Sequence, residues 1–387
     1  MSAPMRVIID MDSTNRALTG IGWYTLHLTR YLPLTDENLE LRAWRQGRVR
    51  LLNETDSTAA GSLPNSRHTK PAFKLDLPAL VRLKKYLQHA RQSRILKSHS
   101  DAIFHGTNFH IPRHSGRTVC TVHDMSIYRF PEHHPRQRVA LQTDNIEYAA
   151  RHADHLITIS EFSKREMLEI LGIPENRISV THLAPRTDYF QRSSSQTAAI
   201  LDRFGLQHGD YAMHVGTIEP RKNIDMLLHA YEGLEQSLRR RFPLVLVGSP
   251  GWLSRATHNK LDRYQSEGWV KYLGYVDESD LPFLYAGARV FVFPSLYEGF
   301  GLPLLEAMSS GVPVLASSIE STIEVAGNAA ALFNPNDPEA LREKLQIVLH
   351  DHAARTEMIS KGLRRSAEFS WLKTASDTYQ VYQDTAG

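Results

Sequence analysis

The sequence predicts an α/β protein made of two Rossmann-like domains that face each other across a cleft. The chain has 387 residues, which is enough for two domains of ordinary size. Short β-branched runs alternate with amphipathic stretches, a pattern typical of parallel sheets with helical crossovers. This alternation occurs twice, once on each side of a polar stretch. Because open parallel sheets bind ligands beyond the carboxyl ends of their strands, the two sheets predict a site between them.

In the first half, a buried strand is expected at Arg6–Asp10, then a loop at Gly20-Ile21-Gly22 and a helix at Trp23–Leu32. Ser160 predicts the N-cap of a helix over Lys164–Leu171. The polar, turn-rich region Gln46–Pro71 predicts a mobile loop. The remaining strands of this half are expected at Ala102–His105, Arg117–Val122, His155–Ile159 and Arg177–Val180.

The stretch Thr181–Thr197 contains Pro185 and a serine run, and it predicts the interdomain linker. Strands of the second half are expected at Tyr211–Val215, Leu244–Val247, Val270–Leu273, Val290–Phe293 and Val312–Ala316. Helices are expected between and after them at Ile224–Leu234, Trp252–Glu267, Asp280–Gly287, Leu302–Ser309 and Pro338–His350. We therefore expect an N-terminal domain over residues 1–185 and a C-terminal domain over residues 198–368.

Composition excludes several classes of protein. The 45 Lys and Arg against 42 Asp and Glu give a net charge of +3, too weak to indicate nucleic-acid binding. No apolar run approaches the ~20 residues that span a bilayer, and Met1–Arg6 does not resemble a signal peptide. The single cysteine, Cys120, fits a reducing compartment, so we expect a cytoplasmic location. The histidine pairs lack a third ligand nearby, so solvated loop histidines are expected rather than zinc.

Residues 72–98 have a distinct charge pattern. Seven basic residues and one acid lie between Lys74 and Lys97, interleaved with leucines and isoleucine. A basic amphipathic helix of this kind can lie on an anionic membrane, which would place the protein at the cytoplasmic face of the inner membrane. The alternative is an ordinary surface helix whose apolar side packs into the core.

The segment Phe291–Ala316 carries the strongest chemical signal. A strand ends at Pro294, a loop containing Glu298 and Gly301 follows, and Pro303 suits the first turn of the next helix. Glycines allow close approach to the backbone, and a helix N-terminus favours anionic or hydroxyl-rich ligands. We expect Glu298 in the loop and Glu306 on the helix to point at such a ligand, where carboxylates accept hydrogen bonds from sugar hydroxyls. The alternative for Glu306 is a solvated helix residue.

A second segment, His214–Asn223, follows the first strand of the second domain. Gly216 frees the backbone, and Arg221 and Lys222 place two positive charges at the strand end. Arg can bind phosphate oxygens in a bidentate way, and Lys adds a point charge. The segment thus predicts phosphate binding, the alternative being a solvated basic pair beside Glu219.

Two segments of the first domain occupy comparable positions. The Gly20-Ile21-Gly22 loop fails as a dinucleotide fingerprint because Thr25 stands where the third glycine is required. It is either a tight turn or a backbone face for phosphate or sugar. His123 and Asp124 end another strand, where His123 is placed for substrate contact and Asp124 could orient it. The alternative is that the pair caps the next turn.

Together these segments resemble the retaining GT-B glycosyltransferases of family 4. The resemblance covers nearly the whole chain: IIDMDSTNRALTGIGWYTLHL, TVHDMSIYRFPEHHP, TISEFSKREM, HVGTIEPRKN, SLYEGFGLPLLEAMSSGVPVLA and FSW occur in the family's order. The members that look most similar transfer mannose or a related deoxymannose from a nucleotide sugar in bacterial polysaccharide assembly. The resemblance also implies a C-terminal helix, within 369–387, that crosses back to the first domain.

The resemblance implies roles for matching residues. Arg221 and Lys222 would stabilise the departing diphosphate, and Glu298 would bind hydroxyls of the donor sugar. Glu306 would bind the ribose hydroxyls, and His123 would contact the donor sugar near its reacting face. The remaining donor-binding positions are Gly20, Gly22, Gly216, Thr217, Phe300, Gly301 and Leu302, and the acceptor-side positions are Trp23, Asp124 and Asn108.

Departures from the family pattern occur near the acceptor and sugar. Trp23 stands where Arg is frequent, and Met11-Asp12 stands where Ala-Arg is frequent. Asp10-Met11-Asp12 mimics the metal-binding motif of the other glycosyltransferase fold, but it lacks that fold's other features. No metal and no cofactor are therefore expected, and the nucleotide sugar is the donor substrate.

The resemblance implies a GDP-sugar donor in preference to a UDP-sugar, and a saccharide or polyprenyl-linked acceptor. We expect an oxocarbenium-like sugar attacked from the face that the diphosphate leaves, without a covalent intermediate. Two alternatives remain open at this point: another GT-B enzyme, such as an epimerase or phosphorylase, and a catalytically silent scaffold that binds nucleotide sugars.

Overall fold

The computed structural model describes residues 4–15, 18, 20–52 and 91–387. The first sheet contains β1 (Met5–Asp10), β2 (Leu39–Arg45), β3 (Arg48–Leu51), β4 (Ile103–Gly106), β5 (Thr118–Thr121), β6 (His155–Thr158) and β7 (Ile178–Val180). They lie in the order β3-β2-β1-β4-β5-β6-β7, and every pairing is parallel except that of β2 with β3.

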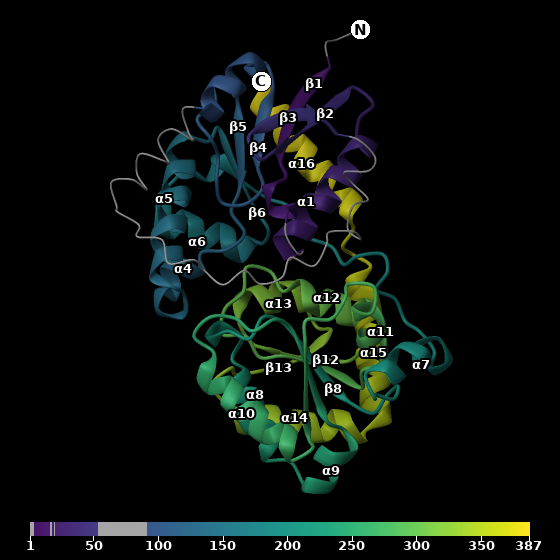
Figure 1. The fold of residues 1–387 in the computed structure, drawn as a ribbon. Helices are drawn as coiled ribbons and strands as arrows, with labels where there is room; N and C mark the ends of the chain where they lie inside the picture. Colours follow the sequence, from purple (N-terminus) through teal and green to yellow (C-terminus); the bar gives the residue numbers. More distant parts are fainter. Residues whose placement is uncertain (1–3, 16–17, 19, 53–90) are drawn as a thin grey trace.

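The second sheet contains β8 (Ala212–Val215), β9 (Leu244–Val247), β10 (Val270–Gly274), β11 (Val290–Phe293), β12 (Val314–Ser317) and β13 (Ala330–Phe333). They lie in the order β10-β9-β8-β11-β12-β13, all parallel. Strand order reverses beside β1 and beside β8, which is the arrangement of a doubly wound sheet. The prediction of two Rossmann-like domains is confirmed (Figure 1).

Helices flank both sheets (Figure 1). Those of the first domain are α1 (Gly20–Tyr31), α4 (Ser126–Arg129), α5 (Arg136–His152) and α6 (Glu161–Leu171), together with helical residues 91–96. Those that follow are α7 (Ser194–Arg203), α8 (Ile224–Glu232), α9 (Gln236–Arg241), α10 (Arg255–Ser266), α11 (Leu281–Gly287), α12 (Leu302–Ser309), α13 (Glu320–Ala326), α14 (Pro338–His350), α15 (His352–Ser366) and α16 (Trp371–Ala386).

Local sequence explains several helix ends. The Ser160 side chain accepts a hydrogen bond from Ser163 N, and Gly172 ends α6 in the left-handed conformation. Ser193 and Gln196 form a reciprocal capping box at the start of α7. The prediction of a linker over Thr181–Thr197 is therefore wrong at its end, because the serine run marks the start of a helix.

Two other predictions need correction. Gly20-Ile21-Gly22 is the first turn of α1, not a loop before it, so the helix begins three residues earlier than expected. Within Gln46–Pro71, Arg48–Leu51 forms the edge strand β3, which pairs with β2, and positions 53–71 lie outside the described residues. The polar residues of this strand obscured it in the sequence, and charged side chains are usual on edge strands.

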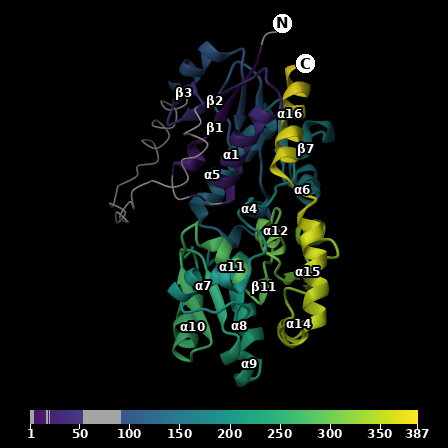
Figure 2. The ribbon, with the colours of Figure 1, turned by 90° about the vertical axis from the view of Figure 1, so that its right-hand side faces the viewer.

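α16 follows the second domain in sequence but packs on the first (Figure 2). The hydroxyl of Tyr382 lies 2.6 Å from Nδ1 of the buried His105 on β4. Tyr379 also donates a hydrogen bond to Asp36, and α16 packs against α1. Its apolar face joins a core cluster that includes both Val7 of β1 and Phe291 of β11, so the two domains share one continuous core.

The basic stretch is only partly described. Residues 72–90 lie outside the described part, so the prediction of membrane contact remains a prediction there. In the described remainder, Arg91, Arg94 and Lys97 are exposed while Leu96 packs into a core cluster of the first domain. Among the described residues, no helix combines the length and apolar character needed to cross a bilayer.

Candidate active site

The carboxyl ends of the two sheets face each other. The loop after β5 meets the loop after β11, where Met125 N donates a hydrogen bond to the hydroxyl of Tyr297 at 3.0 Å. The loop after β6 meets the same segment, where Ser160 Oγ donates to Gly299 O at 2.6 Å. Strand-end residues of both domains are therefore brought to one interface, which is where open parallel sheets bind ligands.

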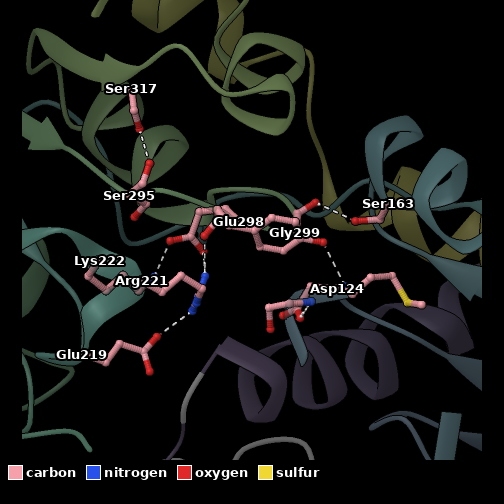
Figure 3. A network of polar contacts seen from close by, with 12 residues as sticks. Asp124, Ser163, Glu219, Arg221, Lys222, Ser295, Glu298, Gly299 and Ser317 are labelled. Atoms are coloured by element: carbon pink, nitrogen blue, oxygen red, sulfur yellow. Dashed lines mark hydrogen bonds and ion pairs between the residues drawn. The ribbon is translucent and has the colours of Figure 1, made fainter. Parts of the chain in front are cut away.

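Arg221, Lys222 and Glu298 form a compact ionic cluster at this interface (Figure 3). Arg221 Nη1 lies 2.7 Å from Glu298 Oε2, and Lys222 Nζ lies 2.5 Å from Glu298 Oε1. Arg221 also donates to the Glu219 carboxylate at 2.8 Å and to Tyr297 O at 2.7 Å. All three side chains of the cluster are about nine-tenths buried. Two segments more than 70 residues apart thus position one carboxylate between two cations.

The charges of this cluster set the protonation of Glu298. Burial alone would raise its pKa, but the adjacent Arg221 and Lys222 lower the pKa of Glu298 to about 2. Burial likewise opposes the charge of Arg221, yet Glu298 and Glu219 hold the pKa of Arg221 above its ordinary value. Glu298 is therefore ionised at neutral pH, where it pairs with both Arg221 and Lys222.

Gly299 allows the two domains to touch. A Cβ at this position would lie 2.1 Å from the carbonyl oxygen of His123 and 3.0 Å from the Asp124 side chain. Real side chains do not approach this closely, so only glycine fits here. Its own carbonyl accepts hydrogen bonds from the hydroxyls of Ser160 and Ser163 (Figure 3).

His123 is buried and oriented by its neighbours. Its Nε2 donates to Thr107 O at 2.8 Å, and its ring meets Tyr24 edge-on. Burial lowers the pKa of His123, so the ring is neutral at pH 7. Asp124 Oδ1 accepts from Ser126 N at 2.9 Å, so Asp124 caps the next turn, which is the alternative raised from the sequence.

Asp124 also affects the charge of Arg221 in the ionic cluster. Its charge raises the pKa of Arg221, which places these two predicted residues near one another across the interface. Asn108, by contrast, is exposed between the buried Thr107 and Phe109, and no contact in the described structure joins it to the cluster.

α12 carries the second half of the segment Phe291–Ala316. Gly301 precedes it with φ of 103°, a conformation that favours glycine, and Leu302 and Pro303 form its first turn. Phe300 is buried in the shared core. Glu306 lies one turn into the helix and is nine-tenths buried.

Glu306 has different surroundings from Glu298. Burial raises the pKa of Glu306 to about 7, and the positive charge of Arg186 opposes that rise. The two glutamates of the motif therefore lie in separate environments, one between two cations and one near Arg186 and the carboxylates of Glu278 and Asp188. This difference could not be inferred from their spacing in the sequence.

The glycine positions differ in the space around them. A Cβ on Gly216 would meet His214 Nε2 at 3.3 Å and the Lys222 side chain at 3.6 Å, so Gly216 lies beside the cluster, followed by half-buried Thr217. Gly22 is buried against Leu18 and Ser13 O, whereas Gly20 has open space around it. Packing within the first domain is thus one reason for glycine at position 22.

Trp23 contacts Arg186 instead of the ionic cluster. The guanidinium of Arg186 lies over its indole ring, 4.1 Å from the ring centroid. His27 stacks beside it at 5.6 Å. Trp23 therefore contacts the segment between β7 and α7, which passes from one domain to the other.

Several interface residues escaped the sequence analysis. The Glu324 carboxylate of α13 accepts from the backbone N–H groups of Glu161 and Phe162, at 2.8 and 2.9 Å, and pairs with His182 at 2.9 Å. Trp252 Nε1 donates to His133 O at 2.6 Å. These contacts join segments distant in sequence, and neither periodicity nor local motif signals them.

The Asp10-Met11-Asp12 motif is occupied by local contacts. Asp10 Oδ1 accepts from Asp12 N at 2.9 Å, and Asp12 Oδ1 accepts from Gln46 N at 2.7 Å. Within the described ranges, no group of three or more His, Cys, Asp or Glu has the arrangement of a metal site.

Comparison with known proteins agrees with this geometry. Residues 18–187 match the family model described as Glycosyltransferase Family 4, and residues 204–365 match Glycosyl transferases group 1. The chain is 38% identical to the O-antigen chain mannosyltransferase B of Escherichia coli, over 98% of this chain and 100% of that protein. The chain belongs to family 4 of the GT-B glycosyltransferases. This glycosyltransferase is also 34% identical to the serotype-specific mannosyltransferase WbdA of E. coli, over 67% of its length and 32% of WbdA.

Solved structures support the fold of the glycosyltransferase. Anabaena HepE, in complex with UDP and glucose, aligns with a TM-score of 0.69 at 16% identity, covering 98% of this chain and 99% of HepE. WaaG, a glycosyltransferase involved in lipopolysaccharide biosynthesis, aligns with a TM-score of 0.67 at 13% identity, covering 99% and 100%. The predicted GT-B fold is confirmed.

Proposed function

We propose that this glycosyltransferase transfers mannose, or a deoxymannose such as rhamnose, from a GDP-sugar to a growing cell-surface polysaccharide. The observation that carries the proposal is the 38% identity to an O-antigen chain mannosyltransferase over nearly the full length of both proteins. The ionic cluster supports it, because Arg221 and Lys222 are buried cations at the strand ends where a donor diphosphate would lie.

The site supports a specific sequence of events. Arg221 and Lys222 bind the diphosphate and stabilise the charge that develops on it as the glycosidic bond breaks. Glu298 binds hydroxyls of the donor sugar and stays ionised because of its two cations. An acceptor hydroxyl then attacks the oxocarbenium-like carbon from the same face and gives its proton to the departing diphosphate, so the anomeric configuration is retained. His123 contacts the donor sugar near its reacting face, and the proposed reaction uses no metal.

The acceptor is proposed to be a saccharide or a polyprenyl-linked saccharide. A lipid-linked acceptor requires a peripheral position at the cytoplasmic face of the inner membrane, for which residues 72–98 supply the basic charge. Contact between the domains over the site excludes water, which limits hydrolysis of the donor.

Turnover with defined donors tests the proposal. Purified protein is incubated with GDP-mannose, with and without a mannose-terminated oligosaccharide, and released GDP is measured. Release that depends on the acceptor, with an α-linked product by NMR, is expected because the donor is an α-linked sugar. Release of GDP without acceptor would indicate a hydrolase, and conversion of the donor sugar without net release of GDP would indicate an epimerase. A rise in melting temperature with GDP, UDP or ADP but no turnover with any donor would indicate a silent scaffold that binds nucleotides.

A further inference from the structure

Arg186 is a buried cation whose side chain contacts both domains. It lies in the segment between β7 and α7 and is 5% exposed. Its guanidinium lies over the Trp23 ring of α1 at 4.1 Å, and its Nη1 lies 2.5 Å from the Glu278 carboxylate in the loop after β10. Nη2 also donates to the backbone carbonyl of Glu278 at 3.1 Å, and Asp188 pairs with Nε and Nη2. One side chain therefore fixes a loop of the second domain against a helix of the first.

The groups that surround Arg186 lie beside Glu306, the proposed ligand of the donor ribose. Glu306 faces charged and titratable groups from three elements: Arg186, Asp188 and Tyr189 of the crossing segment, Glu278 of the loop after β10, and Tyr285 of α11. Arg186 is the cation in this set. An ionised Glu306 carboxyl can accept hydrogen bonds from two ribose hydroxyls with both of its oxygens, whereas protonation turns one oxygen into a donor.

Burial works against that ionisation. It raises the pKa of Glu306 to about 7, and Glu278 and Asp188 add to the rise, whereas Arg186 opposes it. Without Arg186, the pKa of Glu306 would be higher, and less of the carboxyl would be ionised at pH 7.

We infer that Arg186 is a positioning residue for the nucleoside half of the donor. With Trp23 stacked on its guanidinium, Arg186 holds the loop of Glu278 and the Glu306 carboxylate in the arrangement that binds the ligand. The inference rests on the proposed function, because it assumes a nucleoside diphosphate donor. It also gives the departure at Trp23 a role: the indole face completes the binding site of the Arg186 guanidinium.

The position of Arg186 separates it from the diphosphate site. Arg221 and Lys222 lie in the segment after β8 and pair with Glu298, whereas Arg186 pairs with Glu278 and Asp188. A ligand with only phosphate groups should therefore depend on the first pair of cations and not on Arg186. A ligand with a ribose should depend on both.

The test compares two probes, GDP and inorganic pyrophosphate, by calorimetry from pH 6 to pH 9. Arg186→Met should weaken GDP binding about tenfold at pH 7. The pH below which GDP binding weakens, the acidic limb of the pH profile, should rise by about one unit, because a shift of one pKa unit is a tenfold change in the ionisation equilibrium. Pyrophosphate binding should not change. Arg186→Lys should keep the acidic limb near that of the wild type, because the positive charge is retained. It should still weaken GDP binding, because the planar guanidinium that bonds Glu278 and Asp188 is lost.

Trp23→Leu provides a second variant that leaves every ion pair of Arg186 in place. It should weaken GDP binding several-fold and leave pyrophosphate binding unchanged. The inference is overturned if wild-type protein binds GDP while Arg186→Met and Trp23→Leu bind it equally well across the pH range. It is also overturned if Arg186→Met weakens pyrophosphate as much as GDP. Failure of wild-type protein to bind either probe would instead overturn the proposed function.

Discussion

At the scale of single residues, two glutamates eight positions apart have opposite environments. Glu298 lies between Arg221 and Lys222, whose charges bring its pKa to about 2 in spite of burial. Glu306 is equally buried, and burial together with Glu278 brings its pKa to about 7 against the charge of Arg186. The first carboxyl is ionised throughout the physiological range, whereas the second titrates within it.

The ionisation of Glu298 contributes stability only above acidic pH. Its pKa is lower in the folded protein than in the unfolded chain, so the contribution is complete above about pH 4.5 and is lost as pH falls towards 2. Glu298→Gln leaves Arg221 and Lys222 without their shared carboxylate and should lower the free energy of unfolding by about 3 kcal/mol at pH 7. The difference from wild type should shrink at pH 3, as measured by urea unfolding.

Glu320→Gln is the matched control for that experiment. Glu320 pairs with Arg165, and both side chains are more than half exposed, so its loss should cost under about 1 kcal/mol at either pH. An equal effect of the two substitutions would contradict the assignment of Glu298 to a buried ionic cluster.

Lys222→Ala tests the proposed role in leaving-group stabilisation. Loss of one preorganised donor to developing charge typically lowers kcat about 10²–10³-fold, and we expect a decrease in this range with GDP-mannose. Lys373→Ala, which removes an exposed Lys that pairs with Asp377 one turn along α16, should leave kcat unchanged. Near-normal turnover by Lys222→Ala, measured as GDP release, would remove Lys222 from the catalytic residues.

At the scale of elements, the loop between β11 and α12 contacts the first domain directly. Gly299 lies against the carbonyl of His123, and the Ser160 N-cap of α6 donates to the carbonyl of Gly299. The loop therefore sets the spacing of the two sheets where the reacting groups are proposed to meet.

Gly299→Ala should push the β11–α12 loop away from the strand end at His123. The added methyl group would lie 2.1 Å from His123 O, so the loop or the strand end has to move. A displacement of about 1 Å at a reacting centre can cost about 10²-fold in rate, and we expect kcat to fall at least that far. Gly233→Ala is the control, since a Cβ there meets mainly the flexible side chain of Arg342. Equal activity of the two variants by GDP release would contradict this role.

Strands with a continuous apolar run of β-branched or aromatic residues were predicted correctly from the sequence. The runs Leu244–Val247 and Val290–Phe293 are apolar and β-branched or aromatic, and both strands match the structure. β2 was missed because its Leu39–Arg45 sequence mixes charged and apolar residues. α5 was missed because it is mostly polar and buries only Ile146, Ala149 and Ala150.

The same distinction applies to the site. Arg221, Lys222 and Glu298 stand in compact motifs after strands, so their meeting followed from strand-end geometry and the resemblance. Arg186 and Glu324 stand in no motif, and their importance arises from contacts made only after both domains fold. A one-dimensional pattern does not contain such contacts.

At the scale of the whole molecule, an ionic contact joins the domains beside the proposed site. Glu324 of α13 accepts from two N–H groups at the start of α6, where the helix dipole favours negative charge, and also pairs with His182. The pKa of Glu324 is lowered: burial would raise it, but the hydrogen bonds from His182 and from the two backbone N–H groups outweigh burial. The contact holds the domains in the arrangement that covers the site.

Glu324→Gln should weaken that arrangement. Loss of charge-assisted hydrogen bonds costs about 2 kcal/mol, which favours separated domains. We expect a larger radius of gyration by small-angle scattering and a lower kcat, with GDP affinity little changed. Glu339→Gln on α14, whose partner Arg342 lies in the same helix, is the control. An unchanged radius of gyration in Glu324→Gln would show that other contacts determine closure.

The return of α16 to the first domain fixes an order of events during synthesis. About 190 residues lie between the end of β7 at Val180 and the start of α16 at Trp371, and they include the whole second sheet. At roughly 5–20 residues per second, the ribosome needs on the order of ten to forty seconds to make them. Throughout that interval, the His105 face that Tyr382 later covers is bare on the nascent chain. The first domain therefore cannot complete its packing until its final helix is translated, although its sheet is synthesised first.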